Sequence, residues 1–395
     1  MRFLVLLCIS VVLAGCGQLD QLKNLYTSVQ GLLTGTDNAE PPQELSEDFV
    51  PSVEMTVLWK TSVGKGYNEK VVNLVPSVNE ATVYVAAQSG EVEAYNRITG
   101  DLEWSVDLGH RISSGPVQAA DKLLVGTSNA EVIALSLMDG SVQWKTILSS
   151  EVLALPRARK NIVAIRTTDG RLFGLDLNTG HIKWSHERTM PALSVRSLGS
   201  PSIVEDLVID GFGGGKLLAV GLQDGKSAWE STTAVPRGRS EVERLVELNA
   251  EPLAIGDLLY VTGFQAGVSC VSLNDGDVQW RQPKLFSSHG LVAGRKSLFL
   301  SDANSDVWEL DLRNGADMWK QAELHQRRLT MPALLGSYLI VGDFEGYLHA
   351  LSADDGRLLG RFEMDDTPIQ AKPVVYSGII YAYSAGGVLA AIEIH

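Results

Sequence analysis

The chain has 395 residues, of which 45% are hydrophobic, and its formal net charge at pH 7 is −14. This composition provides enough apolar material for a large core. It excludes nucleic-acid binding, because no basic stripe is present to neutralise phosphates. No apolar stretch beyond the N-terminus is long enough to cross a bilayer.

The N-terminus has the features of a targeting sequence. A short basic start is followed by an apolar segment from Phe3 to Leu13, which is too short for a stable membrane span. The segment ends in LAGC and resembles the lipobox of bacterial lipoproteins. This resemblance implies a signal peptide over residues 1–15 and acylation of Cys16. Because no Asp follows Cys16, we expect a lipid anchor in the outer membrane, with the protein facing the periplasm; the alternative is an ordinary signal peptide with a chance cysteine.

Residues 16–50 are predicted to form a tether. The stretch TGTDNAEPPQ, from Thr34 to Gln43, is polar and typical of a flexible linker. Apolar residues between Leu19 and Leu32 are spaced for one face of a short helix, so a docking helix is the alternative to a simple spacer. Among the cysteines, Cys8 would leave with the signal peptide and Cys270 is predicted to be a buried packing residue, which leaves no disulfide within the mature chain.

From residue 51 onward, one phrase recurs. In LDLNTGHIKW, Leu175 to Trp184, a strand leads into a tight turn and a second strand. Related phrases share the turn glycine, at Gly100, Gly140, Gly180, Gly225, Gly276, Gly315 and Gly356. Six of these phrases carry a tryptophan four residues later, at Trp104, Trp144, Trp184, Trp229, Trp280 and Trp319. We expect hairpins whose indoles fill the gaps between neighbouring repeats.

The repeat interval predicts the architecture. Phrases recur every 40 to 50 residues or so, the length of a four-stranded propeller blade. An eighth phrase begins at Gly387 but lacks its last strand, and the unpaired segment MTVLWK, from Met55 to Lys60, offers a replacement. We therefore predict an all-β fold over residues 51–395: an eight-bladed β-propeller of four-stranded antiparallel blades, the last closed by the N-terminal strand.

The repeats also raise the question of catalysis. They resemble the tryptophan-docking repeats of quinoprotein dehydrogenases, eight-bladed propellers that hold pyrroloquinoline quinone and calcium in the central channel. Those enzymes stack the quinone against a disulfide of adjacent cysteines, and this chain has no adjacent cysteines and is far shorter. The seven histidines show no HExxH or helical ligand pair. We predict no enzymatic activity, no cofactor and no catalytic metal; the alternative is an oxidoreductase with a degenerate site.

Two segments break the repeat pattern. Residues 188–201, RTMPALSVRSLGSP, follow Trp184, and residues 231–252 lengthen the interval between Trp229 and Trp280 to the longest in the array. Within the second segment, SEVERLVEL at 240–248 is predicted to form a helical turn. Irregular loops on a rigid scaffold are common sites of partner binding.

The lipobox, tether, eight repeats and the stretches MPALSVR and SEVERLVELN together resemble the propeller lipoproteins of the bacterial β-barrel assembly machinery. The resemblance implies a non-catalytic scaffold that binds the POTRA domains of the central barrel-inserting protein and assists the folding and insertion of β-barrel proteins. It also implies indirect contact with other lipoproteins of the complex. The positions that match the family's partner-binding surface are Leu193, Val195, Arg196, Glu247 and Asn249. Of these, Asn249 lacks the charge expected at its position.

Other interpretations remain open. Leu193 and Val195 alternate as the inward residues of an ordinary strand would. Unfolded outer-membrane proteins are possible direct clients, because their strands could pair with exposed blade edges. A cell-envelope scaffold with a different partner, such as peptidoglycan or a secretion complex, is the remaining alternative.

Overall fold

The computed structural model describes residues 40–67, 72–188, 198–239 and 243–395. The chain divides into two units, Met1–Pro42 and Gln43–His395, and every strand of the described residues lies in the second. The predicted lipid-attachment residue Cys16 and three of the predicted partner residues, Leu193, Val195 and Arg196, lie outside the described residues. In the described part of the chain, no helix is long and apolar enough to cross a membrane.

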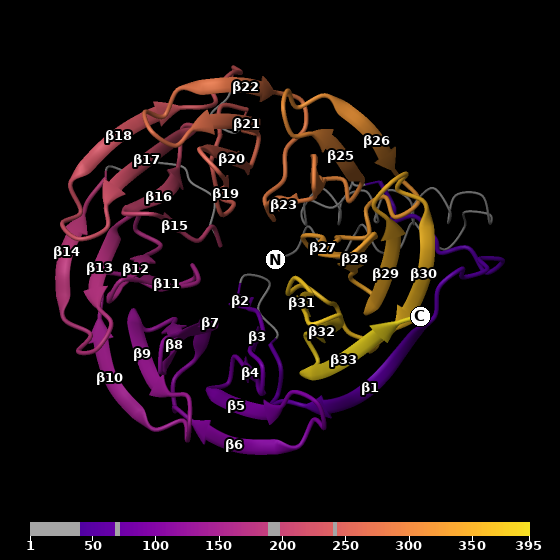
Figure 1. Cartoon of the computed structure of the whole chain (residues 1–395), viewed down its shortest axis with the longest axis horizontal. Coiled ribbons are helices and arrows are strands. Elements are labelled where there is room, and N and C mark those ends of the chain that lie inside the picture. Colours follow the sequence, from indigo (N-terminus) through magenta and orange to yellow (C-terminus); the bar gives the residue numbers. More distant parts are fainter. Residues whose placement is uncertain (1–39, 68–71, 189–197, 240–242) are drawn as a thin grey trace, which may run out of the picture. The chain divides into compact units, whose positions relative to one another are not determined.

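The second unit is an eight-bladed β-propeller, as predicted (Figure 1). Each blade runs from an inner strand beside the central axis to an outer strand at the rim, and we number the blades in chain order from the first complete one.
Blades 1 to 4 comprise β3 (Ser77–Val78), β4 (Thr82–Ala86), β5 (Glu91–Asn96) and β6 (Leu102–Asp107); β7 (Ile112–Ala119), β8 (Lys122–Thr127), β9 (Glu131–Ser136) and β10 (Val142–Ile147); β11 (Arg157–Arg159), β12 (Ile162–Arg166), β13 (Leu172–Asp176) and β14 (Ile182–His186); and β15 (Ser202–Val204), β16 (Leu207–Phe212), β17 (Lys216–Gly221) and β18 (Ser227–Thr232).
Blades 5 to 8 comprise β19 (Leu253–Ile255), β20 (Leu258–Gly263), β21 (Gly267–Ser272) and β22 (Val278–Gln282); β23 (Val292–Ala293), β24 (Ser297–Ser301), β25 (Val307–Asp311) and β26 (Asp317–Gln321); β27 (Ala333–Leu335), β28 (Tyr338–Gly342), β29 (Tyr347–Ser352) and β30 (Leu358–Glu363); and β31 (Val374–Tyr376), β32 (Ile379–Tyr383), β33 (Val388–Ile394) and β1 (Met55–Ser62).

The ring closes where the sequence predicts. The N-terminal strand β1 pairs antiparallel with β33, from Met55 opposite Ile394 to Ser62 opposite Val388, and forms the outer strand of blade 8. This pairing joins the two ends of the repeat array and satisfies the open edge of β33. One strand departs from the prediction: β2 (Asn73–Leu74) pairs parallel with β7 and makes blade 2 five-stranded. A strand of two residues has no periodicity for a sequence pattern to reveal.

The tryptophans connect neighbouring blades, as predicted. Trp184 of blade 3 packs so closely over the turn of blade 4 that a Cβ on Gly225 would lie 2.6 Å from the indole, and Gly225 also adopts a φ of +65°. The Trp184 Nε1 donates a hydrogen bond to the carbonyl oxygen of Leu222 at 2.8 Å. Five further indoles donate to the next blade in the same way, from Trp59, Trp104, Trp144, Trp229 and Trp319. The turn glycine is therefore required twice, for its backbone conformation and for the indole above it.

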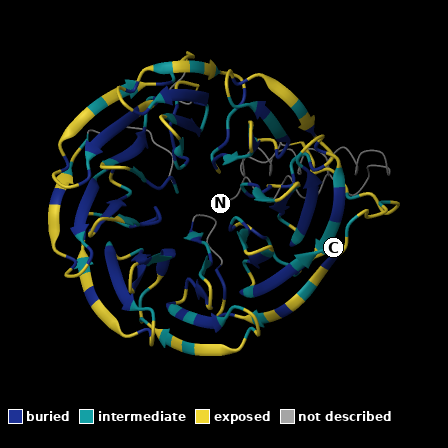
Figure 2. Ribbon diagram, in the orientation of Figure 1, coloured by how far each residue is buried: buried dark blue, intermediate teal, exposed yellow. Residues whose placement is uncertain are grey.

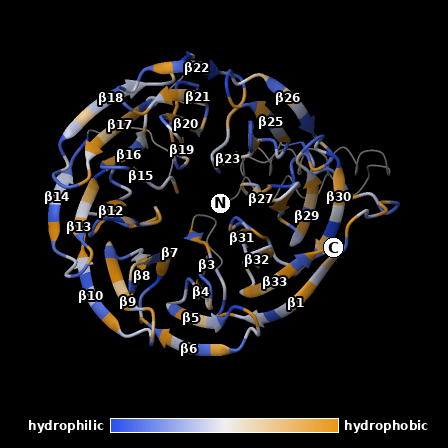
Figure 3. Ribbon diagram, in the orientation of Figure 1, coloured by the Kyte–Doolittle hydropathy of each residue, from blue (hydrophilic) through white to orange (hydrophobic). Residues whose placement is uncertain are grey.

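Burial is graded from the middle of each blade to the rim. The second and third strands are mostly buried, whereas most outer strands consist largely of exposed and half-buried residues (Figure 2). Hydropathy follows the same gradient (Figure 3). Cys270 in β21 is fully buried, which confirms its predicted packing role, and burial raises the pKa of its thiol.

Candidate partner-binding site

Both irregular segments flank blade 4. Residues 187–201 connect β14 of blade 3 to β15, and residues 233–252 connect β18 to β19 of blade 5. Each connection runs from an outer strand to the next inner strand, and in antiparallel blades such connections share one end of the propeller with the β16–β17 hairpin. The fold thus brings together, at one end of blade 4, segments that are separated in the sequence.

The stretch 246–249 is built into blades 4 and 5. Glu247 forms β-bridges to Gly213 of the β16–β17 hairpin and to Phe264 beside the β20–β21 hairpin. The Leu248 amide donates to the carbonyl oxygen of Phe212 at 3.2 Å. The predicted helical turn is not formed over its described residues 243–248, which contain a turn and then these bridges. Pairing with two hairpins takes the place of the internal hydrogen bonds of a helix.

Three glycines allow this stretch to approach the blades. A Cβ on Gly263 would lie 2.1 Å from the carbonyl oxygen of Glu247, and one on Gly211 would lie 2.5 Å from that of Leu248. A Cβ on Gly199, at the end of the first irregular segment, would lie 2.7 Å from the carbonyl group of Asn249. The two irregular segments therefore touch through their backbones at Gly199 and Asn249.

A buried charge cluster includes Glu247 of the same stretch. Arg166 of β12 donates to the carbonyl oxygen of Gly211 at 2.7 Å, and its Nη1 lies 3.5 Å from the Asp210 carboxylate of β16. Its Nη2 lies 3.5 Å from the Glu247 carboxylate. All three side chains are at most 5% exposed. One guanidinium thus serves two carboxylates and links blades 3 and 4 to the second irregular segment; we call these residues the Arg166 cluster.

The predicted partner residues Glu247 and Asn249 are both buried in this arrangement. Glu247 faces Arg166, and the Asn249 Oδ1 accepts a hydrogen bond from the Phe264 amide at 2.9 Å. Their side chains contact the propeller itself. The sequence could not indicate this direction, because an irregular segment has no strand or helix period.

The first irregular segment is anchored at both described ends. Arg188 stacks over Phe212 at 5.0 Å from the ring centroid, and Arg166 lies 5.2 Å from the same centroid. Arg188 Nη2 also pairs with Glu230 at 2.6 Å. At the other end, the Ser200 hydroxyl accepts from the Leu155 amide at 2.8 Å. The predicted residues Leu193, Val195 and Arg196 lie in the span between these anchors.

The Arg166 cluster was not predicted from the sequence, although a signal was present. Asp210 interrupts the apolar strand LVIDGF, and Arg166 ends the apolar run IVAIR. Charged residues are almost never fully buried unless they are paired. When two neighbouring blades each have a charged residue in a core strand, the pattern therefore indicates that these two residues form a buried ion pair.

Burial dominates the electrostatics of Asp210 and raises its pKa from 3.8 to about 6; Arg166 opposes the increase and Glu247 adds to it. The folded protein therefore binds this proton more tightly than the unfolded chain. The resulting stabilisation is complete below about pH 4 and is lost as the pH rises through about 6.

Between about pH 4 and pH 7, the free energy of unfolding of the wild type should fall by about 3 kcal/mol relative to Asp210→Asn. Urea unfolding at several pH values measures this difference, and parallel pH profiles would contradict the assignment.

Among the residues that the structure describes, no group of three or more His, Cys, Asp or Glu side chains is placed to hold a metal ion. The polar residues gathered at this end of blade 4 are instead paired within the fold. Such pairing holds the neighbouring loops in fixed positions, which a recognition surface requires.

Comparison with known proteins agrees with the repeat architecture. A family model described as outer membrane protein assembly factor BamB matches residues 55–120 and 88–321. The BamB protein of Pseudomonas aeruginosa is 45% identical over 370 residues, covering 94% of this chain and 97% of the relative. That of Legionella pneumophila is 45% identical over 364 residues, covering 92% and 94%.

Solved structures share the fold. The crystal structure of BamB from Moraxella catarrhalis matches with a TM-score of 0.77 at 23% identity, covering 86% of this chain and 100% of that chain. A europium-containing methanol dehydrogenase matches with a TM-score of 0.70 at 12% identity, covering 86% and 93%. Because one propeller fold carries both an assembly factor and an enzyme, the fold alone does not assign a function.

Proposed function

The chain belongs to the BamB family of outer membrane protein assembly factors, and we propose from this premise that it is a non-catalytic scaffold subunit of the β-barrel assembly complex. In this role it binds the periplasmic POTRA domains of the central barrel-inserting protein and assists the folding and insertion of β-barrel proteins. Lipidation at Cys16 anchors it in the outer membrane, facing the periplasm. Other lipoproteins of the complex are reached through the shared central subunit.

The partner surface is formed by the two irregular segments at blade 4. The observation that carries this proposal is the backbone contact of Gly199 with Asn249, two residues from Glu247 of the Arg166 cluster, which brings the ends of both segments together. Glu247 and Asn249 then contribute by holding the second segment, while Leu193, Val195 and Arg196 supply the contact. An Arg among apolar neighbours suits the centre of an interface, where a few residues carry most of the binding energy.

Unfolded clients have a separate place to bind. The outer strands of the blades pair on one side only, and several expose large apolar residues, including Leu102, Ile147 and Met318, which are 55%, 71% and 60% exposed. An extended chain could add to such an edge by backbone hydrogen bonding. This second mode would not require the blade 4 surface.

Affinity purification tests the assignment to the complex. The tagged full chain is recovered from detergent-solubilised outer membranes, and co-purifying proteins are identified by mass spectrometry. We expect a POTRA-containing barrel protein in near-equal amount. Recovery of the folded, lipidated chain without that protein would contradict the proposal and favour a scaffold with another envelope partner.

Arg196→Glu should reduce recovery of the barrel protein by about tenfold or more, because a charge reversal at an interface centre loses its contacts and adds repulsion. Arg313→Glu is the matched control, since Arg313 lies on a hairpin turn of blade 6 and its side chain is 83% exposed. Both variants should keep the wild-type melting temperature. Equal recovery with Arg196→Glu and with the control would remove Arg196 from the interface.

A further inference from the structure

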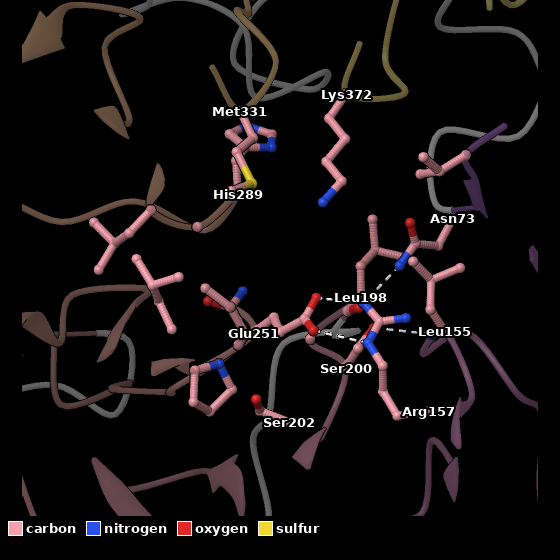
Figure 4. A pocket seen from close by; sticks show the side chains of 18 of the residues that line it. Asn73, Leu155, Arg157, Leu198, Ser200, Ser202, Glu251, His289, Met331 and Lys372 are labelled. Carbon is pink, nitrogen blue, oxygen red and sulfur yellow. Dashed lines mark hydrogen bonds and ion pairs between the residues drawn. The ribbon is translucent and has the colours of Figure 1, made fainter. Parts of the chain in front are cut away.

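A cavity of about 530 Å³ lies at the centre of the propeller, lined by the inner strands and the loops that lead into them (Figure 4). Small-molecule sites in proteins usually have a volume of several hundred Å³. Described residues at the ends of both irregular segments, including Gly199 and Asn249, form part of its wall.

The charge of the cavity is opposite to that of the protein. Of the described residues, its lining contains Arg157, Arg159 and Lys372 against one carboxylate, that of Glu251, a formal charge of three minus one, or +2. The whole chain has a formal charge of −14. A positive, concave site within an acidic protein concentrates small anions, because low-dielectric walls focus the local field.

Among the described residues, neither Lys372 nor Arg159 forms an ion pair, and of the two only Arg159 is exposed, whereas Lys372 is half-buried in the cavity wall. Arg157 holds both oxygens of Glu251, with its Nε 2.8 Å from Oε1 and its Nη2 bonded to Oε2. Figure 4 shows the Lys372 ammonium pointing into the open space across from this pair. Within the described residues, no carboxylate lies within ion-pair distance of the Lys372 ammonium, which therefore has donors available for a ligand.

Burial lowers the pKa of Lys372, and the nearby Glu251 only partly opposes this decrease. Desolvation of an unpaired ammonium is unfavourable, so a bound anion would gain a strong charge-assisted hydrogen bond there. Much of the remaining wall is apolar, including Leu155, Leu291 and Met331. The wall therefore favours an anionic group attached to an apolar body over a small inorganic ion.

We propose that the central cavity binds a small organic carboxylate, with its carboxylate on Lys372 and its apolar body against Leu155, Leu291 and Met331. Its wall shares Gly199 and Asn249 with the proposed partner surface, but the four side chains that would contact the ligand lie outside that surface. It requires neither a metal ion nor a reaction step.

The test uses the full chain in detergent and 2-naphthoate as the probe, followed by isothermal titration calorimetry. We expect one saturable site. Lys372→Met should weaken binding roughly tenfold or more, because the charge-assisted hydrogen bond is lost. Lys372→Arg should largely restore it, and Lys284→Met, which changes an exposed lysine outside the cavity, should have no effect.

Further probes separate the contributions of charge and apolar body. The neutral 2-naphthamide should bind at least tenfold more weakly than 2-naphthoate; equal binding would contradict the role of the ammonium. If inorganic phosphate bound and 2-naphthoate did not, the proposed contribution of the ligand's apolar body would be contradicted. In the unmodified chain, saturating 2-naphthoate should slow acetylation of Lys372 by acetic anhydride, measured by mass spectrometry. Unchanged acetylation would overturn the site even if the Lys372→Met variant failed to fold.

Discussion

Replacing Arg166 with methionine is expected to lower the free energy of unfolding by about 3–5 kcal/mol, because it leaves the carboxylates of Asp210 and Glu247 buried without their cation. Methionine retains most of the side-chain volume, so the loss reports on charge more than on packing. Chemical denaturation of the full chain at about pH 7.5 measures the effect. Arg313→Met removes an exposed ion pair with Asp311 and should change stability by less than about 1 kcal/mol.

The double variant tests the coupling. Adding Asp210→Asn to Arg166→Met should recover part of the lost stability, since one of the two uncompensated charges disappears. In the folded fraction, Arg166→Met should also weaken partner binding, because Glu247 loses the contact that holds the second irregular segment. Wild-type stability in Arg166→Met would show that the cluster does not brace this end of blade 4.

Replacing Trp59 with alanine is expected to destabilise the propeller by about 3–5 kcal/mol. The indole of Trp59 covers Gly100 of blade 1, with a Cβ there calculated to lie 2.7 Å away, and donates to the Arg97 carbonyl oxygen at 2.9 Å. It sits on β1, the strand that closes the ring, so its loss weakens both the packing between blades 8 and 1 and the closure itself. Thermal unfolding by circular dichroism measures the change.

Trp59→Phe is the matched variant. Phenylalanine keeps an aromatic ring in the gap but cannot donate to the Arg97 carbonyl, so it should cost less than Trp59→Ala by about 2 kcal/mol. Limited proteolysis should cut Trp59→Ala first near β1. Equal stability of Trp59→Ala and the wild type would mean that β1 does not depend on this indole for closure.

The propeller was predictable because its determinants are local and repeated. The turn glycine and the tryptophan four residues later, as in Gly180 and Trp184, mark each hairpin and each contact between blades. The closing strand was predictable from the incomplete phrase at Gly387. A repeated structure can be recognised from the sequence alone, because every blade needs the same residue types at the same positions to pack against its neighbours.

The geometry of the proposed partner site was only partly predictable. The irregular segments were located correctly as departures from the repeat, and the structure places their ends together at blade 4. The burial of Glu247 and Asn249 could not be predicted, since it depends on Gly211 and Gly263 in two other hairpins that let the chain approach. Such contacts join residues from different parts of the chain that no repeating sequence pattern relates to one another.

Site-specific photo-crosslinking in cells tests the central claim most directly, namely that this end of blade 4 meets the POTRA domains. A photoreactive residue at position 195 or at the exposed position 237 should crosslink to the POTRA-containing barrel protein. Positions 313 and 355 lie on exposed hairpin turns of blades 6 and 7, at the opposite end of the propeller, and should not. Crosslinks from 313 and 355 but not from 195 and 237 would place the partner on the other face and contradict the account.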